Sequence, residues 1–98
     1  MDGISTLGGD QIQLEILLFA SCKEALGGLS KIKVSLRKGK QSVTWLRSVL
    51  LELYPTLIQV MPSCRIAVSH NLIPIEEEDT HILYATDEIA LIPPVSGG

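Results

Sequence analysis

The C-terminal stretch of the chain carries the residues best suited to chemistry. Its sequence is Pro93-Pro94-Val95-Ser96-Gly97-Gly98. Two consecutive prolines cannot continue a strand or a helix, and they favour an extended polyproline conformation. At about 3.1 Å per residue, this stretch would carry the terminal carboxylate roughly 18 Å from the last ordered element. The pattern therefore predicts a stiff tail that enters the pocket of another protein.

The candidate reactive group is the terminal carboxylate of Gly98. A carboxylate is ionised at neutral pH and is a poor electrophile, so a reaction at its carbon requires prior activation. Glycine at positions 97 and 98 leaves the tail narrow and allows backbone angles that a Cβ forbids. A frayed chain end is the alternative interpretation of a Gly-Gly terminus.

Other chemically active side chains form no recognisable motif. Cys22 and Cys64 stand apart, with no C-x-x-C spacing. This spacing favours the interpretation that both are reduced thiols of a cytosolic protein. A catalytic cysteine and a disulfide are the alternatives. His70 and His81 are interpreted as surface or turn residues because no ligand cluster is spaced to include them. No metal and no bound cofactor is predicted.

Composition favours a single globular domain. The chain has 98 residues, is 46% hydrophobic and has a formal charge of −3 without a basic cluster, which argues against nucleic-acid binding. No apolar run approaches the roughly 18 residues of a membrane span. The segment Met1–Gln11 has two Asp and no Lys or Arg, unlike a signal or transit peptide. We therefore expect a cytosolic protein.

Hydrophobic periodicity predicts a strand from Ile12 to Leu18 and another at residues 31–37. Leu17 and Phe19 break the alternation of the first strand, which indicates that its second face is partly covered by a helix or by a partner. A capping box, Ser21-Cys22-Lys23-Glu24, predicts a short helix at residues 22–26 that ends at Gly27-Gly28.

The second half of the chain begins with the one long helix, which Ser42 caps and Pro55 ends. Further strands are predicted at residues 65–69, before a turn at His70-Asn71, and at residues 88–92. The last strand is apolar after Glu88, so it is expected to be central and buried on both faces. Residues 72–75 are interpreted as an edge strand and residues 82–85 as a short extended piece. The acidic residues 76–79 are interpreted as a solvated loop, with contact to a basic partner as the alternative.

This order predicts an α+β fold of the ubiquitin-like β-grasp class. One long helix would pack on a mixed sheet of four to five strands, with the two terminal strands in the centre. The predicted organisation is a mobile N-terminal extension, a β-grasp domain and an extended tail: residues 1–11, 12–92 and 93–98.

Three segments together resemble the small subunit of molybdopterin synthase, the MoaD-like sulfur carriers. They are residues 12–20, the helix before Tyr54-Pro55 with its Leu-x-x-x-Leu spacing, and residues 87–98 with the Pro-Pro-Val-Ser-Gly-Gly ending. Two features depart from the family pattern. Thr86 stands where relatives often have glycine, and the N-terminal extension is additional.

The resemblance implies a sulfur carrier that is inactive alone. An E1-like enzyme would use ATP to form a transient Gly98 acyl-adenylate, which a sulfur donor would convert to a thiocarboxylate. Residues Pro93, Pro94, Val95, Ser96 and Gly97 would thread the tail into the large subunit of molybdopterin synthase. There the sulfur would pass to cyclic pyranopterin monophosphate and build the dithiolene. Two small subunits would flank a dimer of the large one.

Other functions remain open from the sequence. The chain could be a ubiquitin-like modifier conjugated to lysines, a carrier for tRNA thiolation, or a thiamin-type sulfur carrier. An unrelated structural subunit with an accidental tail is the last alternative.

Overall fold

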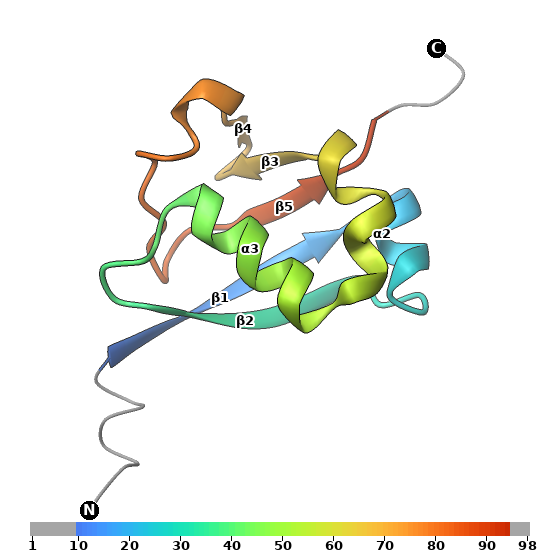
Figure 1. Cartoon of the computed structure of the whole chain (residues 1–98), viewed down its shortest axis with the longest axis horizontal. Helices are drawn as coiled ribbons and strands as arrows, with labels where there is room; N and C mark the ends of the chain where they lie inside the picture. Colours follow the sequence, from blue (N-terminus) through green and yellow to red (C-terminus); the bar gives the residue numbers. More distant parts are fainter. Residues whose placement is uncertain (1–9, 95–98) are drawn as a thin grey trace, which may run out of the picture.

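The computed structural model describes residues 10–94, which form a mixed sheet with helices packed on one face (Figure 1). Most of the predicted extension, residues 1–9, and Val95–Gly98 of the tail lie outside the described residues. The strands are β1 Gln11–Leu18, β2 Lys31–Arg37, β3 Arg65–Val68, β4 Asn71–Leu72 and β5 Ile89–Ile92. The α-helices are α2 Ala20–Ala25 and α3 Val43–Leu53, and the 3-10 helices are η1 Pro55–Gln59, η2 Met61–Ser63 and η3 Ile75–Glu77.

The sheet has five strands in the order β2-β1-β5-β3-β4. The first and last strands pair in parallel at its centre, while the other neighbours are antiparallel. In Figure 1, β1 and β5 accordingly point the same way and β3 points the opposite way. This topology confirms the predicted β-grasp arrangement.

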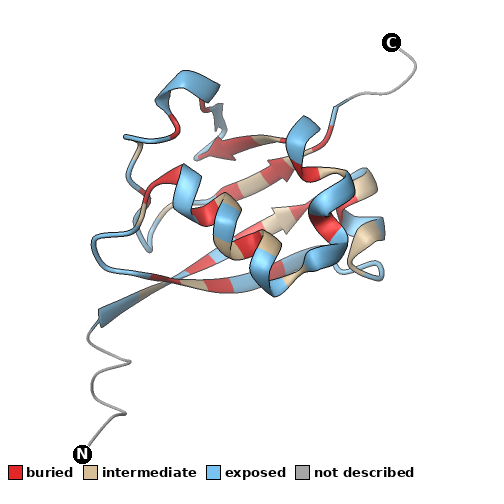
Figure 2. Ribbon diagram, in the orientation of Figure 1, coloured by how far each residue is buried: buried red, intermediate tan, exposed pale blue. Residues whose placement is uncertain are grey.

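The core lies between the sheet and α3 (Figure 2). Alternation along β1 buries Leu14, Ile16 and Leu18 at 2% exposure or less. The matching stripe of α3 is Val43, Leu46 and Leu50, spaced by three and four residues and fully buried. Burying one such side chain stabilises the fold by about 1.5–3 kcal/mol, so this layer is the main source of stability.

The start of α3 agrees with the prediction from the sequence, whereas the start of α2 does not. The Ser42 hydroxyl accepts a hydrogen bond from the Trp45 backbone N–H at 3.2 Å, as predicted for an N-cap. The Ser21 capping box is wrong, because α2 begins at Ala20, after Phe19, with no side-chain cap. Ala20 has a positive φ of 47°, so the backbone changes direction there, one residue before Ser21.

Two features of the second half also differ from the prediction. The turn after β3 uses Ser69 and His70, with φ of 50° and 73°, and Asn71 instead opens β4 and pairs with Val68. The acidic run is not wholly solvated, because Glu78 is only 6% exposed.

Glu78 is buried because Arg47 of α3 lies beside it. The Arg47 Nε and Nη2 atoms donate to the two Glu78 carboxylate oxygens at 2.7 and 2.8 Å. The same guanidinium donates to the carbonyl oxygens of Met61 and Cys64. One side chain thus joins α3 to η3 and to the segment that enters β3. Such a planar group can satisfy several acceptors at once, whereas a lysine cannot hold this geometry.

We predict that Arg47→Met will lower the free energy of unfolding by about 3 kcal/mol, because it leaves the Glu78 carboxylate buried without its cation. Urea denaturation followed by circular dichroism measures this change. Lys31→Met is the matched control, because it breaks the exposed pair that Lys31 makes with Glu15 at 3.5 Å. An exposed pair contributes less than about 1 kcal/mol. Equal destabilisation by the two variants would contradict the stabilising role of Arg47 beside the buried Glu78.

Candidate functional site

The root of the tail is the end of β5, which is held on both sides. Leu91 pairs with Leu18 of β1 and with Ile66 of β3, and its side chain is fully buried. Pro93 is also buried, whereas Pro94 is exposed. The first residue of the predicted tail, Pro93, is therefore part of the folded body, and the chain reaches the surface at Pro94. The remaining predicted site residues, Val95, Ser96, Gly97 and Gly98, lie outside the described residues.

The prediction that β5 is buried on both faces is wrong. Ile89 and Leu91 are fully buried under the helices, but Ala90 and Ile92 are only half-buried. The helices cover one face of the sheet, and no second layer of the described residues covers these two side chains. An apolar strand at the centre of a sheet thus presents one face toward solvent.

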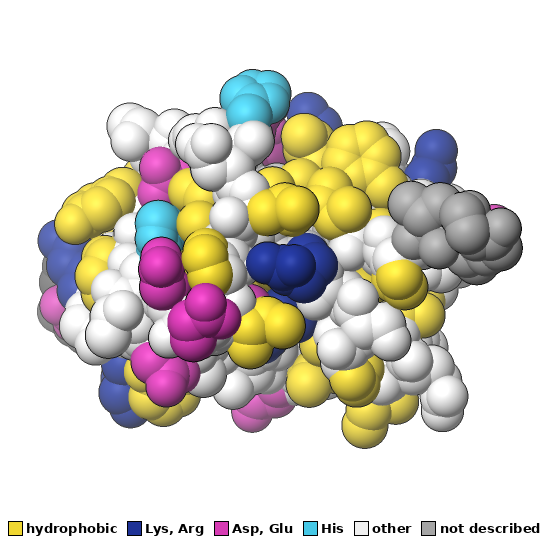
Figure 3. All heavy atoms as spheres, turned by 90° about the horizontal axis from the view of Figure 1, so that it is seen from above, with side chains coloured by type: hydrophobic (Ala, Val, Ile, Leu, Met, Phe, Trp, Pro, Cys, Tyr) yellow, Lys and Arg dark blue, Asp and Glu magenta, His cyan; other side chains and the backbone are white. Residues whose placement is uncertain are grey.

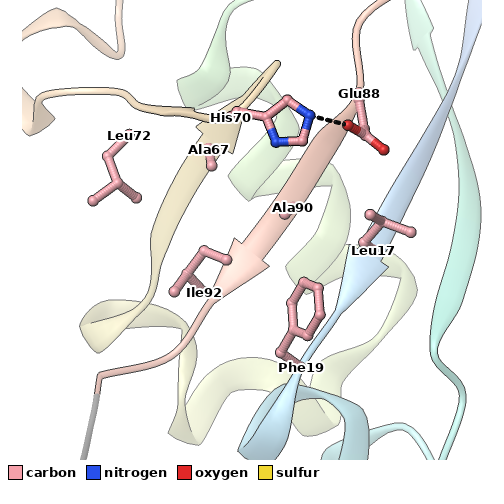
Figure 4. Close-up of a pocket in the computed structure, with 8 residues that line it drawn as sticks. All are labelled: Leu17, Phe19, Ala67, His70, Leu72, Glu88, Ala90 and Ile92. Carbon is pink, nitrogen blue, oxygen red and sulfur yellow. Dashed lines mark ion pairs between the residues drawn. The ribbon is translucent and has the colours of Figure 1, made fainter.

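Around Ala90 and Ile92 this open face forms an apolar groove (Figure 4). Leu17 and Ala67 flank Ala90 as its direct partners on β1 and β3. In Figure 4 the labelled side chains lie across the four strands β1, β5, β3 and β4, with the helices behind the sheet. The full lining is Leu17, Phe19, Ala67, His70, Leu72, Glu88, Ala90 and Ile92.

The two polar residues of the groove lie together at one end. His70 Nε2 is 2.9 Å from a Glu88 carboxylate oxygen, and both side chains are more than half exposed. An exposed pair of this kind contributes little to stability. The opposite end of the groove is apolar and reaches Ile92, the residue directly before Pro93. The groove therefore leads to the root of the tail.

Two large apolar side chains of the groove are strongly exposed. Phe19 is 47% and Leu72 is 53% exposed. The broken alternation at Leu17 and Phe19 had indicated that something covers this face, and no helix of the described residues does so. The contributions of Ala67 and Leu72 were missed, because they depend on which strands become neighbours. The sequence feature that could have indicated an apolar surface here is the uninterrupted apolar run of β5, which includes Ala90 and Ile92.

The surface seen from above in Figure 3 groups acidic side chains on one side, with hydrophobic side chains beside them. Among residues 10–94, no cluster of His, Cys, Asp and Glu could hold a metal ion. Within the same range, no helix has the length and apolar character needed to cross a membrane. His70 lines the groove, whereas His81 is not among the residues that do so.

The two cysteines, which look isolated in the sequence, meet in the fold. Their Sγ atoms are 3.1 Å apart, although the residues are 42 positions apart in the chain. Both are free thiols and both are buried. Burial raises the pKa of the Cys22 thiol to about 12, and the hydrogen bond and proximity to Cys64 add to this shift.

Comparison with known families identifies the chain, because the ThiS family model matches residues 16–98. The chain belongs to the ThiS family. A molybdopterin synthase sulfur carrier subunit of Dictyostelium discoideum is 37% identical over 86 residues, which are 88% of this chain and 96% of that protein. The predicted resemblance to this group of sulfur carriers is therefore confirmed.

Solved structures of this fold include two instructive neighbours. The small archaeal modifier protein 1 of Methanosarcina acetivorans is 27% identical, with a TM-score of 0.69, over 92% of this chain and 100% of that one. A complex of subunits 1 and 2 of the molybdopterin-converting factor of Helicobacter pylori contains a chain that is 24% identical, with a TM-score of 0.63. That match covers 89% of this chain and 100% of the other. The second likeness supports the β-grasp fold alone.

We predict that Leu91→Ala will lower the free energy of unfolding by about 3 kcal/mol, because it leaves a cavity where β5 is anchored. Ile92→Ala is the matched control one residue closer to the tail. Its side chain is half-buried on the open face, so we expect a loss of about 1 kcal/mol. Urea denaturation of both variants measures the difference. A larger loss for Ile92→Ala would show that the open face, and not the helix-covered face, anchors the tail.

Proposed function

We propose that this chain carries sulfur as a thiocarboxylate on Gly98 and donates it in the synthesis of molybdopterin. The proposal is supported by the Pro-Pro-Val-Ser-Gly-Gly ending, by family membership and by the name of the Dictyostelium discoideum relative. The single structural observation that carries it is the anchored end of β5, from which the tail continues. Its acceptor would be cyclic pyranopterin monophosphate.

Activation of Gly98 requires a partner enzyme. In the proposed sequence a carboxylate oxygen attacks the α-phosphorus of ATP, and pyrophosphate leaves. Hydrosulfide released by the sulfur donor then attacks the acyl carbon and displaces AMP, and the thiocarboxylic acid formed loses its proton. An E1-like adenylating enzyme would bind the nucleotide, because the tail itself offers no charged side chain from Pro93 to Gly98. The product is a thiocarboxylate whose ionised sulfur is a good nucleophile, by the same logic that makes a thiolate reactive.

The division of labour follows from the composition of the tail. No side chain between Pro93 and Gly98 titrates near neutral pH, so the tail itself offers no general acid or base, and we assign these roles to the partner. The folded body anchors the tail, and the two terminal glycines keep the reactive end narrow enough for an enclosed pocket. This chain would thus supply the sulfur atom, and the large subunit would supply the substrate pocket and the proton transfers.

The apolar groove is the proposed docking surface for the large subunit. It is continuous with the tail root at Ile92, so a partner seated on it would be in position to receive the tail. Its exposed Phe19 is one of the aromatic side chains that are enriched in interfaces, and the exposed Leu72 adds to the apolar area of the groove. The complex of the two Helicobacter pylori subunits supports a heteromeric assembly for a protein of this fold.

We predict that deletion of Gly98 or Gly98→Ala will reduce sulfur transfer at least about 100-fold, because the reacting carbon is displaced or obstructed. The wild-type protein, incubated with an E1-like enzyme, ATP and a sulfur donor, should exchange one oxygen for sulfur. Intact-mass analysis followed by peptide mapping measures the exchange and its position.

Glu52→Ala is the control for the Gly98 variants, since Glu52 is exposed on α3. It should acquire sulfur like the wild type. The Gly98 variants should keep wild-type stability, because they change the tail and leave the core intact. Loss of folding in either variant would contradict the proposed division between body and tail. Sulfur attached at any other residue would contradict Gly98 as the carrier.

We predict that Phe19→Asp will weaken binding to the large subunit at least tenfold, or about 1.4 kcal/mol, because it places a charge in the apolar groove. Isothermal titration calorimetry with the purified large subunit measures the affinity. Leu72→Asp should act in the same direction, since this side chain lines the groove on β4.

Ile58→Asp is the matched control for the groove variants. Ile58 is 62% exposed on η1, which packs against α2 and α3 and contributes nothing to the groove. Its substitution introduces the same charge on the helical side of the molecule and should leave the affinity unchanged. An equal loss of affinity for Ile58→Asp and Phe19→Asp would place the interface elsewhere.

A second candidate function is a protein modifier. The likeness to the small archaeal modifier protein 1 favours it, because that protein shares the fold at 27% identity. A modifier also needs an activated terminal glycine, so adenylation of Gly98 does not separate the two functions. An isopeptide bond between Gly98 and a lysine of another protein, detected by mass spectrometry, would favour the modifier. Transfer of sulfur from Gly98 to a pterin would favour the carrier.

A further inference from the structure

A pair of buried thiols lies beside the root of the tail. Cys22 belongs to α2, which directly follows β1, and Cys64 directly precedes β3. Because β1 and β3 are the two neighbours of β5, these cysteines come from the segments on either side of the strand that leads to the tail. In Figure 1, α2 and the helical turn before β3 lie close together at the end of the sheet where β5 stops.

The thiols form a short chain of polar contacts in an apolar setting. The two Sγ atoms are 3.1 Å apart, and the Cys64 thiol donates to the Val60 carbonyl oxygen at 3.1 Å. Since that donor is already used, Cys22 is the donor in the contact between the sulfurs. The sulfurs would have to approach by only about 1 Å to reach the S–S bond length of roughly 2.0 Å.

Cys64 also lies next to a route from solvent. It lines a surface hollow between α3, η2 and η3, together with Met61 and Arg47. Cys22 is 0% exposed and lies deeper. A small oxidant entering from the hollow would therefore meet Cys64 first.

We propose that Cys22 and Cys64 are an oxidation site that closes to an intramolecular disulfide when a peroxide reaches the hollow. The role is separate from sulfur transfer by Gly98, because it uses different atoms. It assigns chemistry to two buried thiols that the proposed carrier reaction does not need.

The oxidation proceeds in two steps that balance. The Cys64 sulfur attacks one peroxide oxygen, the O–O bond breaks, and a sulfenic acid and one water form. The Cys22 sulfur then attacks the sulfenic sulfur, the S–O bond breaks, and the hydroxyl leaves as water with the Cys22 proton. Two thiols and one hydrogen peroxide thus give one disulfide and two waters. The raised pKa of Cys22 keeps this thiol protonated at neutral pH and makes it a poor nucleophile for peroxide, so the first attack is assigned to Cys64. In the second step the Cys22 sulfur must lose its proton as it attacks, and the departing hydroxyl accepts that proton.

The disulfide would join the two segments that flank the tail root. It would close a loop between positions 42 apart, which removes conformational freedom mainly from the unfolded chain. The oxidised protein should therefore have a higher Tm than the reduced protein, by roughly 10 °C for a domain of this size. In the oxidised protein a covalent bond would thus connect the segment after β1 to the segment before β3, on either side of the strand that leads to the tail.

The test is oxidation of the full-length, fully reduced protein with hydrogen peroxide, with an unstructured cysteine peptide present as an internal standard. Once the standard is oxidised, intact-mass analysis should show that the protein has lost two hydrogens. Proteolysis without reductant should yield one peptide pair joined through Cys22 and Cys64. Thiol reduction should restore both the mass and the lower Tm.

Cys22→Ala supplies the matched control. It lacks the second thiol, so the sulfenic acid at Cys64 should persist and be trapped by dimedone, whereas the wild type should not be trapped. Unreacted cysteines in the wild type after oxidation of the standard would overturn the proposal. Stable addition of oxygen to a wild-type cysteine, or disulfides between different molecules, would also overturn it. The wild-type result decides the matter even if the variant does not fold.

Discussion

The structure depends on the position of β5 between β1 and β3. Parallel pairing with β1 and antiparallel pairing with β3 fix the last strand in the centre of the sheet. Ile89 and Leu91 are consequently buried under the helices, and the chain reaches the surface at Pro94, after Pro93, which is still buried. A tail that continues from a central strand is tied to the most stable part of the domain. Thermal motion at the root of the tail is thereby restricted.

The same central position explains the unusual surface of the domain. In a two-layer fold one face of the sheet is covered by helices and the other face is usually polar. Here Leu17, Ala90 and Ala67 lie side by side on the open face, and Phe19 and Leu72 enlarge the apolar area. Removing this area from water would stabilise a complex, which supports the proposed role of the groove as a docking surface. The groove and the root of the tail share Ile92, so the proposed docking surface adjoins the start of the tail.

Local sequence patterns predicted the elements well, and long-range contacts account for what they missed. The alternation in β1 and β2 and the Ser42 cap of α3 follow from neighbouring residues, so they could be predicted. The burial of Glu78 depends on Arg47, which is 31 positions away, and the cysteine pair spans 42 positions. Apolar residues in β5 predicted burial on both faces, but whether a second layer covers the sheet depends on the rest of the chain, and the described residues leave one face open. For the site, the sequence indicated the residues at the end of β1, while the other strands of the groove required the topology. The predicted tail residues 95–98 lie outside the described residues.

The central claim is that sulfur on the terminal carbon of Gly98 is the atom that the pterin receives. It is tested most directly by loading Gly98 with isotopically labelled sulfur, removing the E1-like enzyme, and mixing the carrier with the large subunit and cyclic pyranopterin monophosphate. Because each carrier holds one sulfur and a dithiolene contains two, two labelled carriers should be consumed for each labelled dithiolene. Label that remains on Gly98 while unlabelled dithiolene forms would contradict it.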